Sequence, residues 1–138
     1  MIAYIDSSVL LRYLFNETNP LKEFSQVKKP ISSVLLRTEC FRCLDRARIR
    51  FQLSNEEVAK KYQEIDMAVK AFHLIQINST VLDRAEEAFP TLLGTLDAIH
   101  LSSALIYREN SKEELFFFTH DTELGYAAQA KGFSALGI

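Results

Sequence analysis

Four acidic residues occupy positions from which their carboxylates could meet at one edge of a sheet, and we call them the acidic quartet: Asp6, Glu39, Asp97 and Asp121. Asp6 directly follows the apolar run 2–5, and Asp121 comes shortly after the apolar run 115–118. If both runs are parallel strands, the two aspartates leave the sheet at the edge where α/β proteins bind ligands. Clustered carboxylates repel one another unless a cation lies between them. Oxygen ligands favour Mg²⁺, with Mn²⁺ as a substitute, over zinc.

The other two acids lie on predicted helices. Glu39 falls in the second turn of a helix expected over 34–49, at the flank of its apolar stripe rather than on its solvated face. Asp97 falls in the first turn of a helix expected over 95–107, with apolar residues behind it. The helices would therefore have to bring both carboxylates to the same edge of the sheet.

Each acid also has a simpler explanation. Asp6 and Asp121 could be helix N-caps, Asp97 could be an acid favoured by the helix dipole, and Glu39 could be a solvated helix residue. Taken singly, these explanations are preferable. They do not account for four acids at helix starts or stripe edges, two of them after buried strands.

Short apolar runs alternate with helical periods along the whole chain. Strands are expected over 2–5, 31–32, 73–77, 115–119 and 133–136, and helices over 9–15, from Pro20, 34–49, from Ser54 or Asn55 to Phe72, 81–89, 95–107 and 122–131. Strands separated by helices pair in parallel through right-handed crossovers. The pattern predicts one domain, 1–138, with a three-layer α/β/α fold and a mostly parallel sheet of about five strands.

Composition excludes several classes of protein. The 138 residues include 16 Lys and Arg against 18 Asp and Glu, a formal net charge of −2, which argues against a polybasic nucleic-acid binder. Without the acidic quartet the remainder would be slightly cationic. The apolar runs are too short to cross a bilayer, and residues 1–5 begin as a strand rather than a leader, so we expect a cytoplasmic protein.

Cys40 and Cys43 form a C-x-x-C inside a predicted helix, which favours core packing over redox chemistry.

Four segments together resemble the motifs of PIN domains. They are Asp6-Ser7-Ser8-Val9-Leu10, Arg37-Thr38-Glu39, Leu96-Asp97-Ala98-Ile99-His100-Leu101 and Phe118-Thr119-His120-Asp121. They occur in the family's order along the whole chain, and they are most similar to those of VapC-type ribonuclease toxins of toxin–antitoxin modules. Each short motif is weak by itself, whereas the combination is quite specific.

The resemblance implies a Mg²⁺-dependent endoribonuclease in which the acidic quartet binds metal and activated water hydrolyses RNA, leaving 5′-phosphate and 3′-hydroxyl ends. Ser7 or Ser8, together with Thr119, would supply hydroxyls that orient the carboxylates or a water. It also implies two partners. One is an antitoxin that blocks the carboxylate pocket, and the other is a second copy of the chain, joined through the early apolar residues Leu10, Leu11, Leu14 and Phe15.

RNA would also need cationic contacts. Arg42, Arg46 and Arg50 recur every four residues on the helix that contains Glu39, and we favour Arg42 and Arg46 as phosphate contacts. Ion pairs on a solvated face explain them equally well. The three histidines could support a metal-free mechanism, but a packed or surface role is the better expectation for each of them.

Three other functions are also compatible with the sequence. The chain could be a PIN nuclease for RNA processing or DNA cleavage, a receiver-like regulatory α/β module, or a scaffold that only binds. A receiver would leave Glu39 and Asp97 without a role, and the compact length favours the toxin.

Overall fold

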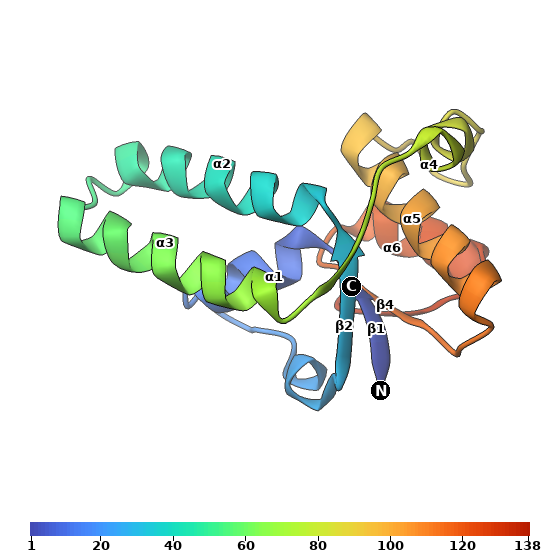
Figure 1. Cartoon of the computed structure of the whole chain (residues 1–138), viewed down its shortest axis with the longest axis horizontal. Coiled ribbons are helices and arrows are strands. Elements are labelled where there is room, and N and C mark those ends of the chain that lie inside the picture. The colour runs from blue at the N-terminus through green and yellow to red at the C-terminus, as the bar shows by residue number, and fades with distance from the viewer.

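The computed structural model describes residues 1–138, in which five parallel strands form one sheet between two layers of helices (Figure 1). The sheet order is β3-β2-β1-β4-β5. Its strands are β1 (Ile2–Ile5), β2 (Lys29–Ser33), β3 (His73–Ile75), β4 (Phe116–Phe118) and β5 (Ser134–Leu136). The three-layer fold predicted from the sequence is confirmed, and every strand of the sheet is parallel to its neighbours.

Each predicted helix is present, but the one expected over 81–89 already ends at Ala85, the one expected over 95–107 continues to Ser111, and the one expected from Pro20 is a short 3₁₀ helix. The helices are α1 (Ser7–Leu14), the short 3₁₀ helix η1 (Lys22–Gln26), α2 (Leu35–Arg50), α3 (Asn55–Lys70), α4 (Ser79–Ala85), α5 (Thr95–Ser111) and α6 (Thr122–Ala130). Helix α1 begins at Ser7, two residues before the predicted start, because Asp6 caps it directly after β1. Helix α3 begins as predicted, since Ser54 and Glu57 form a reciprocal capping box.

Alternate residues of the central strands pack on opposite faces of the sheet. Tyr4 and Phe117 belong to the apolar cluster formed with α5 and α6. Ile5 and Phe118 face the other way, where Val9 of α1 packs against them. Because successive side chains point to opposite faces, β1 and β4 are packed on both faces of the sheet. This packing holds the end of each strand in place.

Helices α2 and α3 form an antiparallel pair that extends away from the sheet (Figure 1). Their shared core includes Cys40, whose burial raises the pKa of its thiol to about 12. Cys40 is completely buried in this cluster, so the predicted core packing is confirmed for it. None of the helices combines the length and the apolar character that crossing a membrane would require.

One part of the predicted dimer surface is wrong. Leu10 and Leu14 are buried in the core between α1, α2 and α3, because the apolar stripe of α1 faces its own chain. Leu11 and Phe15 are only partly buried against the same core. The proposed early-helix surface therefore cannot include Leu10 and Leu14.

The C-terminal residues pack against the end of β4. The Thr119 backbone N–H donates to the Leu136 carbonyl over 3.1 Å, and the His120 ring N–H at Nδ1 donates to the Gly137 carbonyl over 2.9 Å. Gly137 has a φ of +106°, and a Cβ there would collide with the Thr119 carbonyl oxygen. The close approach that holds this loop therefore requires glycine.

We expect Gly137→Ala to destabilise the protein by about 2 kcal/mol, because the substitution adds both a clash and a strained φ. Gly94 is the matched control: a Cβ there meets nothing within 4 Å. Gly94→Ala should change stability by less than about 0.5 kcal/mol. Urea denaturation measures both values, and equal stability of the two variants would contradict the packing described.

Candidate functional site

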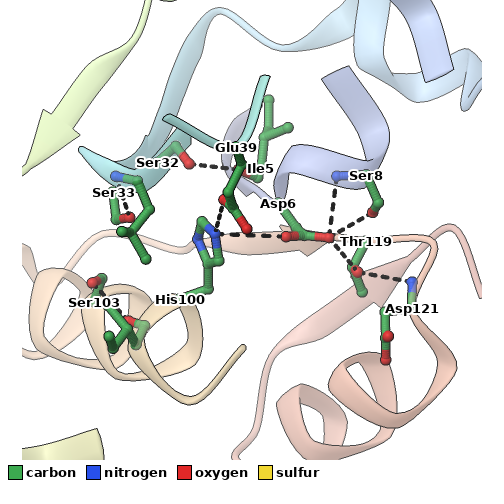
Figure 2. A network of polar contacts seen from close by, with 12 residues as sticks. Ile5, Asp6, Ser8, Ser32, Ser33, Glu39, His100, Ser103, Thr119 and Asp121 are labelled. Atoms are coloured by element: carbon green, nitrogen blue, oxygen red, sulfur yellow. Dashed lines mark hydrogen bonds and ion pairs between the residues drawn. The ribbon is translucent and has the colours of Figure 1, made fainter. Parts of the chain in front are cut away.

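Asp6 lies directly after β1 and is almost completely buried. Its Oδ2 accepts hydrogen bonds from the Ser8 hydroxyl at 2.5 Å, from the Thr119 hydroxyl at 3.0 Å and from the Ser8 backbone N–H at 3.3 Å (Figure 2). The last contact caps α1, so the N-cap interpretation is confirmed. It engages only one oxygen. Oδ1 makes no hydrogen bond and lies 3.8 Å from His100 Nε2, so it is free to bind a ligand.

Asp121 follows β4 and is exposed. Its Oδ1 accepts from the Leu124 backbone N–H at 2.8 Å and caps α6, while its own backbone N–H donates to the Thr119 hydroxyl over 3.0 Å. Thr119 thereby joins the Asp6 and Asp121 segments (Figure 2). As with Asp6, one carboxylate oxygen caps a helix and the other has no protein partner.

The structure distinguishes between the two candidate serines. The Ser8 hydroxyl donates to Asp6 and accepts from the His120 backbone N–H at 3.0 Å. Ser7 is buried but makes no hydrogen bond to any member of the acidic quartet. Of the predicted hydroxyls, Ser8 and Thr119 therefore orient Asp6, and Ser7 does not.

Glu39 reaches the site from α2 and meets His100 of α5. The His100 Nε2 and the Glu39 Oε2 are 2.6 Å apart, and the Glu39 side chain is only 18% exposed (Figure 2). A solvated-helix explanation for Glu39 is therefore wrong. On the other side of the ring, His100 Nδ1 lies 2.7 Å from the Tyr4 hydroxyl of β1.

His100 is a residue of the site that the sequence analysis did not select. It is completely buried, as the packed-histidine interpretation expects, but it is packed against two carboxylates. Burial would lower the pKa of His100, yet the hydrogen bond to Glu39 and the negative charges of Asp6, Glu39 and Asp97 raise it above its ordinary value. The sequence feature that could have identified His100 as a site residue is its position three residues after Asp97, on the same face of the helix.

Asp97 lies in the first turn of α5 and is partly buried. Desolvation and the negative charges of Asp6, Asp121 and Glu39 raise its pKa to about 6, although His100 partly opposes the shift. All three other members of the quartet therefore act electrostatically on Asp97. The four carboxylates predicted from the sequence lie in one neighbourhood at the carboxyl edge of the sheet.

No lysine or arginine forms a salt bridge with any member of the acidic quartet, although seven such bridges occur elsewhere in the protein. The chemistry of the donors thus fits a hard divalent cation: oxygen ligands, negative charge and no lysine or arginine that competes for them. The geometry is that of an open cluster, since no three acidic, histidine or cysteine side chains converge on a common ion position.

The basic residues of α2 are exposed. Arg42 forms a salt bridge with Asp45 over 3.1 Å. Arg46 has no acidic partner and comes seven residues, or two helical turns, after Glu39, on the same side of α2. The ion-pair interpretation therefore holds for Arg42, whereas Arg46 keeps its charge available.

Comparison with known proteins agrees with this arrangement. Residues 3–129 match the PIN domain family, and the chain belongs to that family. The sequence is also 33% identical over 104 residues to Ribonuclease VapC46 of Mycobacterium tuberculosis, across 73% of this chain and 72% of that protein. The resemblance to VapC-type PIN proteins is confirmed, and the receiver-like alternative is wrong.

We expect Asp97→Asn to stabilise the metal-free protein in EDTA by about 1 kcal/mol at pH 7.5, because it removes one of the repelling charges. The folded-state pKa of about 6 exceeds the ordinary value of 3.8, so the penalty develops as the pH rises from about 4 to 6 and disappears below that window.

The control for this prediction is Asp83→Asn, at an exposed aspartate of α4 outside the quartet. It should leave stability within about 0.5 kcal/mol of the parent at every pH. Thermal or urea unfolding at pH 4 and pH 7.5 provides the comparison. A destabilised Asp97→Asn protein at pH 7.5 would contradict the repulsion described above.

Proposed function

We propose that this chain is a divalent-metal-dependent endoribonuclease, the toxin of a toxin–antitoxin module. The observation on which this proposal depends is Asp6, a buried carboxylate with one free oxygen and no lysine or arginine partner, beside three further acids. Membership of the PIN family and the similarity to Ribonuclease VapC46 support the same activity. The inferred cation is Mg²⁺, with Mn²⁺ as a substitute.

In this proposal the acidic quartet would hold the cation. When bound, it would supply a Lewis acid and lower the pKa of a water molecule. Asp6 is held rigidly by Ser8 and Thr119, which saturate its Oδ2 and leave Oδ1 directed into the site. Attack on phosphorus by water, rather than by the ribose 2′-oxygen, leaves a 5′-phosphate and a 3′-hydroxyl.

The proposed partners are RNA and an antitoxin protein. The antitoxin would act by covering the carboxylates, for which a cationic side chain is the complementary group. A homodimer is part of the proposal, through a surface other than the buried Leu10 and Leu14. The proposal also places the chain in the cytoplasm, with its RNA substrate.

Asp6→Asn should lower the rate of RNA cleavage in Mg²⁺ by at least about 100-fold, because the amide keeps the shape and removes the charge. The fold should survive, since an amide oxygen can still accept from Ser8 and Thr119. Cleavage of a fluorescent RNA by the purified chain measures the effect, with Asp83→Asn as the control.

Two outcomes would refute the proposal. Wild-type cleavage by the Asp6→Asn protein would remove the quartet from the chemistry. Cleavage of DNA in place of RNA by the parent protein would favour the alternative PIN nuclease function.

Arg46→Ala should weaken RNA binding by about three- to tenfold at low salt and reduce its salt dependence, because one phosphate contact is lost. Arg48→Ala is the matched control, since Arg48 lies nine residues after Glu39 and on the opposite side of α2, where it contacts Asn55. Fluorescence anisotropy with the inactive Asp6→Asn protein measures both. Equal losses for the two variants would show that α2 contributes only general positive charge.

A further inference from the structure

Three side chains from three different elements form a buried polar chain that ends in the acidic quartet. Tyr4 of β1 contacts His100 of α5, and His100 contacts Glu39 of α2, over 2.7 Å and 2.6 Å. Tyr4 and His100 are completely buried, and Glu39 largely so. These three hydrogen-bonded side chains connect the middle of the core with the Glu39 carboxylate at the surface of the site. Figure 2 shows the contact between His100 and Glu39.

The contacts determine which ring nitrogen bears hydrogen. Nε2 faces carboxylate oxygens of Glu39 and Asp6, which only accept hydrogen bonds, so Nε2 must be the N–H donor. Nδ1 faces the Tyr4 hydroxyl, which can donate to a bare nitrogen or accept from an N–H. Burial raises the pKa of Tyr4, so its hydroxyl keeps its proton. The ring is therefore held in one orientation whether or not it is charged.

We propose that His100 is a positioning residue that fixes the Glu39 carboxylate for binding of the cation, with Tyr4 fixing the His100 ring. The inference rests on the proposed function, because it gives His100 a purpose only if Glu39 is a ligand. A glutamate on a helix has several accessible rotamers, and a short hydrogen bond to a buried donor selects one of them. Hydrogen-bond partners of metal ligands commonly change metal affinity by about 10- to 100-fold.

The alternative is that His100 only fills the core where β1, α2 and α5 meet. Positioning of Glu39 requires a hydrogen-bond donor at the place of the His100 Nε2 atom, whereas filling the core does not. An asparagine at this position can keep the contact with Tyr4 but is too short to reach Glu39, whereas a glutamine amide can extend to the place of Nε2. Because glutamine also fills more of the buried volume than asparagine, the deciding observation is whether the effect of the substitution depends on Glu39.

The test is Mn²⁺ binding to the purified full chain, measured by electron paramagnetic resonance of the free ion. We expect His100→Asn to weaken Mn²⁺ binding about tenfold, and His100→Gln to stay within about threefold of the parent. Tyr4→Phe, which removes only a hydroxyl, should weaken binding about fivefold. His73→Asn, at an exposed histidine of β3, should have no effect. Circular dichroism verifies that each variant folds.

A double-mutant cycle with Glu39→Ala decides the mechanism. If His100 acts through Glu39, His100→Asn should cause no further loss of Mn²⁺ affinity in the Glu39→Ala protein. An equal loss in both backgrounds, or equal affinities of the Asn and Gln variants, would overturn the positioning role. A parent that binds Mn²⁺ but does not cleave RNA would refute the proposed function alone. A parent that binds no Mn²⁺ would overturn both.

Discussion

Mutual repulsion among the carboxylates of the acidic quartet is the constraint on which the arrangement of the site depends. Strands β1 and β4 are parallel neighbours with Ile5 opposite Phe118, so Asp6 and the Thr119–Asp121 segment must leave the sheet together. Helices α2 and α5 then add Glu39 and Asp97 to the same edge, and the pKa of Asp97 rises in response. A protein without a use for these charges would gain stability by dispersing them.

The fold offsets part of this repulsion because each aspartate that follows a strand also caps a helix. One oxygen of Asp6 and one of Asp121 cap α1 and α6 and so contribute to stability. Hydroxyls and backbone amides satisfy these oxygens, and the second oxygen of each carboxylate makes no hydrogen bond within the protein. Capping and ligand binding are therefore not competing explanations for Asp6 and Asp121. The same residue can cap a helix with one oxygen and, in the proposed function, bind the cation with the other.

The sequence allowed the fold and the quartet to be predicted, because strand ends and helix starts are encoded locally. Thr119 and the capping role of Asp6 follow from the same local pattern. His100 could not be selected in this way: its spacing from Asp97 gives a helix face, but only the tertiary structure places Tyr4 and Glu39 on either side of its ring. The prediction that Leu10 and Leu14 lie on a dimer surface was wrong for the same reason. Apolar spacing does not reveal whether one face of a helix packs on the core of its own chain or on a partner.

In the proposed function, these carboxylates serve the hydrolysis of RNA by water with a divalent cation. Mass spectrometry of the ends of an RNA cut by the purified chain tests it most directly. Water as the nucleophile should leave 5′-phosphate and 3′-hydroxyl ends in Mg²⁺, and EDTA should leave the RNA intact. Ends bearing a 2′,3′-cyclic phosphate, or undiminished cleavage in EDTA, would contradict it.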